Sequence, residues 1–351
     1  MTKIDDFMLA SQPRASILIV YTGGTMGMDY DENGSLAPCG FERILARIPV
    51  LKELNINLSV ISFETPIDSS NINGDHWRQI ATIIKDEYDN FDGFIVLHGT
   101  DTMAYSASAV SFMLQGVNKP IIFTGAQLPI ASPRSDGQDN FVTALEIAAD
   151  QRDGKPVISE VCIFFNHLLL RGNRSKKVES QHFDAFESEN YPVLAEAGIV
   201  IDYNWPAIKP YNPDVTLTLH ADLSAEVLIF KLFPGINSAI ASALLGAPGV
   251  RGIVMESYGS GNVPHQAWFL DMLEQTIAKG ITVLNVSQCN GGRVVQGKYQ
   301  SSSSLEGMGV VSGRDLTTEA ATTKLMHALA KYDEPEAVKN CLITSISGEI
   351  N

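Results

Sequence analysis

The stretch Ile17–Gly27, ILIVYTGGTMG, joins a run of apolar residues to a glycine-rich turn that carries two threonines. A related arrangement recurs at Phe94–Met103, FIVLHGTDTM. Short continuous apolar runs are typical of strands that are buried on both faces of a parallel sheet. Open α/β sheets bind their ligands beyond the carboxyl ends of such strands. We therefore predict that both threonine-bearing turns lie at the edge of the sheet where ligands bind.

The same alternation of apolar run, loop and amphipathic stretch continues along the first part of the chain. The expected strands are Leu58–Phe63, which should end before Pro66, Pro120–Phe123 and Val161–Phe165. The expected helices are Trp77–Tyr88, Tyr105–Leu114 with Asp101 or Thr102 as its cap, and Phe141–Ala149. Strands and helices that alternate at this spacing indicate parallel βαβ units.

Three prolines interrupt the pattern between Trp205 and Pro213, and a second series then begins. It comprises strands at Val227–Phe233, Gly252–Met255 and Ile281–Val286, a loop at Ser301–Ser304 and a helix at Thr317–Leu329. We predict an α/β protein with two α/β domains and mainly parallel sheets. The larger N-terminal domain, 1–205, should carry most of the active site, followed by a linker at 206–224 and a C-terminal domain at 225–351.

Composition narrows the class of protein. The chain has 351 residues, of which 45% are hydrophobic, so it can bury a sizeable core. Its formal net charge of −15 argues against a nucleic-acid or anionic-membrane partner. Met1–Arg14 lacks the apolar core of a signal peptide, and no apolar run is long enough to span a bilayer. Cys162 and Cys289 are expected as buried free thiols, as in a reducing compartment. We expect a cytoplasmic enzyme.

Hydroxyl, carboxyl and amine groups in these turns suggest nucleophilic catalysis. A threonine hydroxyl becomes a good nucleophile when a base takes its proton and a third group holds that base. Thr25 follows two glycines, Thr100 and Asp101 are adjacent, and Lys176 or Lys177 can supply an amine. Each stretch alone also fits ordinary turn, cap or solvated-loop chemistry. Their occurrence together at strand ends favours a site.

The histidine pattern predicts neither a metal nor another cofactor. The seven histidines are dispersed and show no HxH or HExxH spacing. His98, next to the second threonine-bearing turn, is expected to serve the structure of its loop.

Several motifs together resemble the bacterial-type L-asparaginases, and in particular their cytoplasmic type I branch. The resemblance covers nearly the whole chain. Beside Tyr21–Thr25 and His98–Met103, the motifs that carry it are Asp68–Ser70, Gly125–Pro129, Arg171–Arg174 and Ser257–Asn262.

The resemblance implies roles for particular residues. Thr25 matches the first catalytic threonine of the family, the nucleophile. Thr100, Asp101 and Lys177 match its second threonine and the aspartate and lysine associated with it.

The resemblance also implies a substrate-binding set, Asp68, Ser69, Ala126 and Asn262. Asp68 and Ser69 match the pair that binds the α-amino and α-carboxylate groups of the substrate. Asn262 matches an asparagine of the second domain that reaches a neighbouring subunit, which implies a homodimer or homotetramer.

Two positions depart from the family. Ser35 stands where the family has a tyrosine after the first motif, and Tyr30 is a candidate replacement. Glu256 stands where an allosterically regulated relative has arginine, so allosteric control by asparagine is not implied here.

The resemblance thus implies hydrolysis of the small molecule L-asparagine to L-aspartate and ammonia. A glutaminase-like amidohydrolase stays open, since one methylene in a pocket is worth only about 1–3 kcal/mol. An amidotransferase subunit acting on tRNA shares the threonine motifs, but the acidic balance counts against it. A nucleotide-binding module is disfavoured because Thr22–Gly27 contains neither GxGxxG nor GxxxxGK[ST].

Overall fold

The computed structural model describes residues 4–30, 36–38, 40–296 and 300–351. They form two compact units, Met1–Ala221 and Asp222–Asn351. The stretch 206–221, which we expected to begin a linker, is hydrogen-bonded within the first unit. Asn118 Nδ2 donates to Asn212 O at 2.6 Å, and Lys85 Nζ donates to Leu217 O at 3.0 Å. The expected boundaries at 205 and 225 stay a prediction.

A nine-stranded sheet forms the centre of the first unit. Its spatial order is β1 (Asp5–Phe7), β5 (Asn57–Ile67), β2 (Ser16–Gly23), β6 (Gly93–Leu97), β8 (Ile121–Thr124), β11 (Val161–Phe165), β12 (Leu168–Arg171), β15 (Ala195–Ala197) and β16 (Ile201–Tyr203). The strands from β5 to β11 are parallel, and the outer pairs are antiparallel. The carboxyl ends of β5, β2, β6 and β8 therefore lie along one edge.

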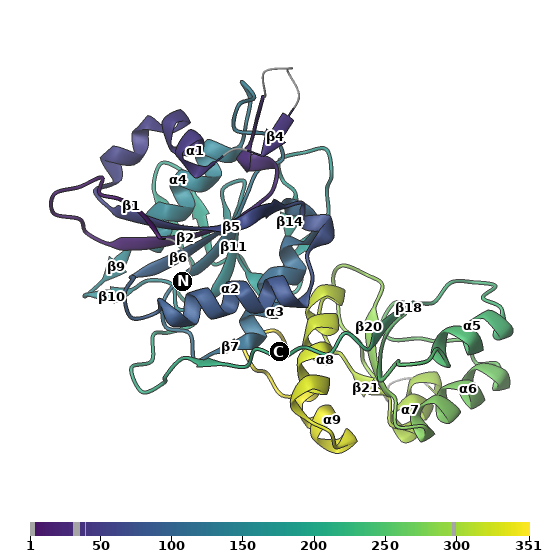
Figure 1. Ribbon diagram of the computed structural model, residues 1–351. Helices are drawn as coiled ribbons and strands as arrows, with labels where there is room; N and C mark the ends of the chain where they lie inside the picture. Colours follow the sequence, from purple (N-terminus) through teal and green to yellow (C-terminus); the bar gives the residue numbers. More distant parts are fainter. Residues whose placement is uncertain (1–3, 31–35, 39, 297–299) are drawn as a thin grey trace. The chain divides into compact units, whose positions relative to one another are not determined.

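Helices cover both faces of this sheet (Figure 1). One face carries α1 (Phe41–Arg47) and α4 (Gly137–Ala148), and the other carries α2 (Gly74–Asp86) and α3 (Met103–Met113). Helix α2 begins after its N-cap residue Asn73, whose Oδ1 accepts from Asp75 N at 3.0 Å. Shorter elements are η1 (Thr25–Gly27), β3 (Met28–Tyr30), β4 (Leu36–Pro38), η2 (Pro49–Leu54), η3 (Ser69–Asn71), η4 (Thr100–Thr102), β7 (Leu114–Gln115), β9 (Gln151–Arg152), β10 (Lys155–Pro156), η5 (Gly172–Arg174), β13 (Lys176–Lys177), β14 (Phe186–Glu187) and β17 (Thr218–Leu219).

The prediction that the strand at Leu58–Phe63 ends before Pro66 is wrong. Strand β5 continues to Ile67, and its pairing with β2 shifts register between Tyr21, which pairs with Ser62, and Gly23, which pairs with Ile67. Proline has no N–H to donate to a ladder, so it is tolerated at such an irregularity.

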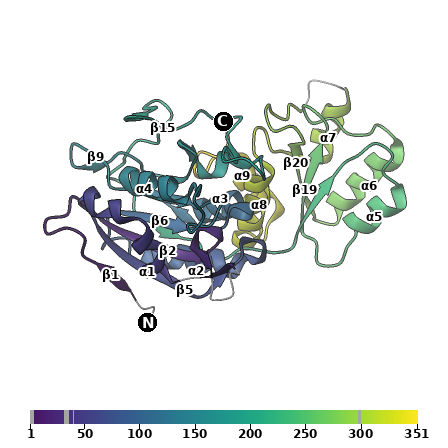
Figure 2. The same ribbon diagram turned by 90° about the horizontal axis from the view of Figure 1, so that it is seen from above.

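A smaller parallel sheet forms the centre of the second unit. Its strands, in order, are β18 (Val227–Lys231), β19 (Gly252–Ser257), β20 (Thr282–Ser287) and β21 (Val311–Ser312). Helices α5 (Ser238–Leu245), α6 (Ala267–Ala278) and α7 (Gln300–Met308) lie on one side, and α8 (Thr318–Lys331) and α9 (Pro335–Ile343) on the other (Figures 1 and 2). The predicted class, two α/β parts with mainly parallel sheets, is confirmed.

Two expectations for the second unit are wrong. The serine run Ser301–Ser304 lies in α7 and not in a loop, since the helix brings Leu305 into the core of the unit. Cys289 is exposed, because it follows the end of β20 instead of lying within it. Cys162, within β11, is buried as expected. Among the described residues, none of the helices has the length and apolar character needed to cross a membrane.

A buried hydrogen-bonded chain ties the end of β6 to α2 and α3. Trp77 Nε1 donates to Ser106 Oγ at 2.7 Å, and the Ser106 hydroxyl lies 2.8 Å from His98 Nε2. His98 Nδ1 lies 2.6 Å from Gly99 O, which can only accept. Nδ1 therefore carries a proton, and because burial keeps the ring neutral near pH 7, Nε2 accepts from the Ser106 hydroxyl. Burial lowers the pKa of His98 from 6.5 to about 4, against a smaller opposing effect of the Gly99 carbonyl.

This histidine should make stability depend on pH. Between pH 6.5 and about 4 the unfolded chain binds a proton at this histidine that the folded protein does not. The contribution of neutral His98 to the free energy of unfolding is therefore present above pH 6.5 and is lost as pH falls toward 4. The shift corresponds to about 3 kcal/mol. We predict that the difference in free energy of unfolding between the wild type and His98→Gln shrinks by that amount from pH 7 to pH 4, measured by urea unfolding. The exposed His265→Gln is the control, and an unchanged difference for His98→Gln would contradict the neutral buried histidine.

Candidate active site

Three loops at the carboxyl edge of the first sheet pack closely at two glycines. A Cβ at Gly24 would lie 2.5 Å from Gly99 N, and a Cβ at Gly99 would lie 2.6 Å from Ser69 Oγ. Gly24 also has φ of 87°, which side chains other than glycine rarely adopt. Only glycine allows this approach, and it brings together the loops that hold Thr25, Thr100 and Ser69.

Lys177 joins Thr100 and Asp101 directly. Its Nζ donates to Thr100 Oγ1 at 2.8 Å and to Asp101 Oδ1 at 2.7 Å. The Lys177 side chain is 16% exposed, whereas that of Asp101 is 68% exposed. The carboxylate thus reaches in from solvent and holds a mostly buried ammonium group against the threonine hydroxyl. The predicted grouping of these three residues is present in the structure.

The chain positions Lys177 through a short antiparallel pairing. Strand β13 pairs with β14, with Lys176 opposite Glu187 and Lys177 opposite Phe186. Successive side chains of a strand point to opposite faces, so Lys177 faces Thr100 and Lys176 faces away from it. The basic stretch is not a solvated loop, since Arg171 and Arg174 at its start are buried.

The turn after β5 adjoins these groups. Asp68 is exposed, and its Oδ1 accepts from Ser70 N at 3.0 Å. Ser69 is buried, and its carbonyl accepts from Thr102 Oγ1 at 2.7 Å. Thr102 is the N-cap residue of α3, but its hydroxyl holds the Ser69 turn instead of capping the helix, which corrects that expectation. A cavity of about 490 Å³ opens beside Asp68.

Gln127 is a site residue that sequence reasoning missed. Ala126, which we had selected in the same motif, is buried. Gln127 Oε1 accepts from Thr100 Oγ1 at 3.0 Å, and its Nε2 donates to His182 O at 3.1 Å. Its place three residues after β8, in a motif at the carboxyl edge, was the available signal.

The expected roles of Tyr30 and Asn262, and the departure at Ser35, stay predictions. The side chain of Tyr30, in β3, and all of Ser35 lie outside the described part of the chain. Asn262 lies in a turn of the second unit, where its N–H donates to Tyr258 O at 2.8 Å. Its contact with a neighbouring subunit stays a prediction. Glu256, also in the second unit, accepts from Thr318 Oγ1 at 2.6 Å.

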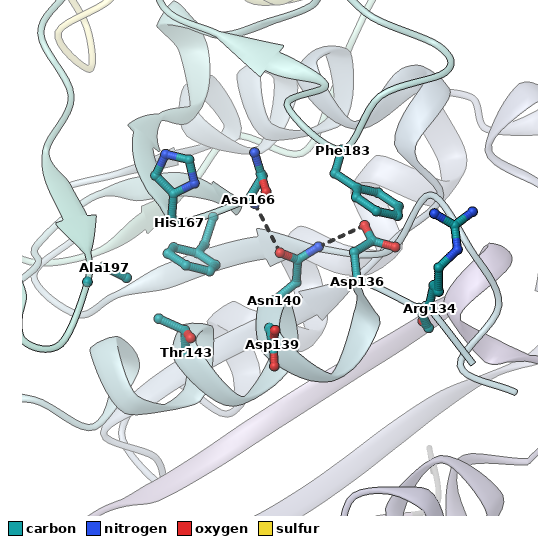
Figure 3. Close-up of a pocket in the computed structure, with 12 residues that line it drawn as sticks. Arg134, Asp136, Asp139, Asn140, Thr143, Asn166, His167, Phe183 and Ala197 are labelled. Carbon is teal, nitrogen blue, oxygen red and sulfur yellow. Dashed lines mark hydrogen bonds between the residues drawn. The ribbon is translucent and has the colours of Figure 1, made fainter. Parts of the chain in front are cut away.

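A second cavity of the first unit, about 470 Å³, lies at the beginning of α4 (Figure 3). Arg134, Asp136, Asn140, Asn166 and His167 are among its lining residues, and none of the expected catalytic residues lines it. It is therefore separate from the threonine site. In the described ranges, no group of three or more His, Cys, Asp or Glu side chains is placed to hold a metal ion.

Comparison with known proteins covers both units. Residues 16–209 match the family model "Asparaginase, N-terminal", and residues 226–342 match "Glutaminase/Asparaginase C-terminal domain". The chain is 40% identical to L-asparaginase 1 of Escherichia coli over 339 residues, which cover 96% of this chain and 98% of that protein.

Solved structures agree with these matches. L-asparaginase I from Vibrio cholerae superposes with a TM-score of 0.87 at 37% identity, covering 96% of this chain and 99% of that one. The thermostable L-asparaginase from Thermococcus kodakarensis gives the same TM-score and coverage at 31% identity. With its threonine-bearing strand ends and both halves matched, the chain belongs to the asparaginase family.

Proposed function

We propose that this protein hydrolyses L-asparagine to L-aspartate and ammonia, with Thr25 as the nucleophile. The observation that carries the proposal is Lys177 Nζ, hydrogen-bonded to both Thr100 Oγ1 and Asp101 Oδ1 beside the Thr25 loop. An amine held by a carboxylate against a hydroxyl is the arrangement that proton transfer to and from a nucleophile requires. The near full-length similarity to L-asparaginase 1 supports the choice of substrate.

The proposed reaction has two stages. Thr25 Oγ bonds to the side-chain amide carbon and gives up its proton, and the C–N bond breaks as the nitrogen leaves as ammonia. Water then attacks the resulting ester, which releases L-aspartate and restores the Thr25 hydroxyl. Thr100 and Lys177 relay the protons in both stages. Asp68, Ser69 and Asp101 hold the α-amino and α-carboxylate groups, and Ala126 lines the site.

The proposal also covers the cellular location of the enzyme and its oligomeric state. Cys162, Cys289 and Cys341 are free cysteines, which is typical of proteins in reducing compartments, and supports a cytoplasmic enzyme. We place the activity in asparagine metabolism and assign no cofactor. A homodimer or homotetramer follows if Asn262 completes the site of a neighbouring subunit.

Replacing the nucleophile should abolish turnover without unfolding the protein. Thr25→Val keeps nearly the same volume but has no hydroxyl, so we predict a loss of at least about 10³-fold in kcat. Ammonia release from L-asparagine, D-asparagine and L-glutamine measures both activity and preference. The exposed Thr216→Val serves as the control. A folded Thr25→Val enzyme with near-wild-type ammonia release would refute the nucleophile, and no release from L-asparagine by the wild type would refute the proposed function.

The two neighbouring lysines offer a matched pair. Lys177→Met removes the group that contacts Thr100 and Asp101, so we predict a fall in kcat of about 10²-fold or more. Lys176→Met removes a similar charge from the opposite face of β13 and should change kcat by less than about threefold. Equal, mild losses in both variants would show that this lysine pair has no catalytic member.

Assembly can be tested through dilution. If Asn262 contributes to a neighbouring site, specific activity should fall as subunits separate, because symmetric assemblies form shared sites in equivalent pairs. Light scattering and activity are measured over the same dilution series. Full specific activity in a demonstrated monomer would contradict the shared site.

A further inference from the structure

The loop that carries Gln127 is held at four points by the beginning of α4. Asp136 accepts from Gln127 N at 2.9 and 3.0 Å through its two oxygens, and from Leu128 N at 3.1 Å. Ser135 Oγ donates to Leu128 O at 3.0 Å, and Asn140 Nδ2 donates to Gly125 O at 3.0 Å. The backbone between Gly125 and Leu128 is therefore fixed to one helix end.

Asp136 is itself held in place. Asn140 Nδ2 donates to Asp136 Oδ2 at 3.1 Å, and Asn140 Oδ1 accepts from Asn166 N at 3.0 Å (Figure 3). Asn140 is 2% exposed, so these bonds are protected from water. The carboxylate consequently has one orientation relative to the Gln127 backbone.

The orientation of the Gln127 amide follows from its two partners. His182 O can only accept, so the NH₂ end must face it. The carbonyl end then faces Thr100, where it accepts the hydroxyl proton at 3.0 Å.

A hydroxyl has one proton and two lone pairs. In this structure Lys177 Nζ donates to one lone pair of Thr100 Oγ1, and the Thr100 proton points to Gln127. The second lone pair is left to accept the hydrogen bond of the reacting hydroxyl, and when Thr100 takes up that proton its own proton passes to Lys177 as the neutral amine. Without Gln127, the Thr100 proton can rotate into that position and block it.

We propose that Gln127 is a positioning residue that directs the Thr100 hydroxyl proton, and that Asp136 acts through Gln127 by holding its loop. The inference deepens the proposed function, since it rests on Thr100 being part of the proton relay. In the proposed function neither residue belongs to the set that holds the substrate. Their loss should therefore lower kcat and leave KM unchanged.

The experiment is a double-mutant cycle on ammonia release from L-asparagine. Gln127→Met, similar in length but without the acceptor oxygen, should lower kcat about tenfold with KM within about twofold, the size of one lost hydrogen bond. Asp136→Asn should lower kcat as well. If Asp136 acts through Gln127, the double variant should be no slower than the slower single variant, because residues in one network are not additive.

Gln181→Met, an exposed glutamine next to His182, is the matched control and should keep wild-type kcat. Wild-type kcat in folded Gln127→Met overturns the inference, as does a tenfold rise in KM at constant kcat. Fully additive losses in the double variant overturn the role given to Asp136. If Asp136→Asn does not fold, Gln127→Met decides alone. An inactive wild type would refute the proposed function instead, so the two failures are distinguishable.

Discussion

The site depends on the contact between two backbones, at Gly24 and Gly99. Any side chain at either position would overlap a neighbouring loop, with 2.5 Å between a Gly24 Cβ and Gly99 N. Because β2 and β6 are adjacent and parallel, their carboxyl ends already lie side by side. The missing side chain of Gly24 lets the two turns close on each other, and that of Gly99 leaves room for Ser69, so the loops that carry Thr25 and Thr100 lie together.

Buried polar groups around this contact are paired, which keeps the turns in one conformation. His98 is neutral and bonded at both ring nitrogens, so the loop before Thr100 has a single arrangement. On the other side, Asp136 fixes the Gln127 loop. The Lys177 ammonium, held by Asp101, is then presented to the Thr100 hydroxyl. The chemistry rests on a preorganised frame.

Much of the fold, and the edge of the sheet that carries the candidate site, could be predicted from the sequence. Continuous apolar runs such as Ile17–Val20 identify buried parallel strands, and parallel strands determine which turns share an edge. Side-chain contacts across loops leave weaker signals. Gln127 was overlooked because a glutamine after a strand is as typical of a solvated turn. The predicted strand end before Pro66 was wrong because β5 continues through a register shift. The predicted loop at Ser301–Ser304 was wrong because the packing of Leu305 in the core outweighs the weak local preference of serine. The choice of Lys177 over Lys176 came from the resemblance to the family. The structure explains it, because side chains alternate between the two faces of β13.

The most direct test of the account is a crystal structure of the protein with L-aspartate, the proposed product. We predict density at the carboxyl edge of β2, β5 and β6, with the side-chain carboxylate at Thr25 and Thr100 and the α-amino group at Asp68 and Asp101. Density for L-aspartate only in the cavity beside Arg134 and His167, or in the second unit, would contradict it.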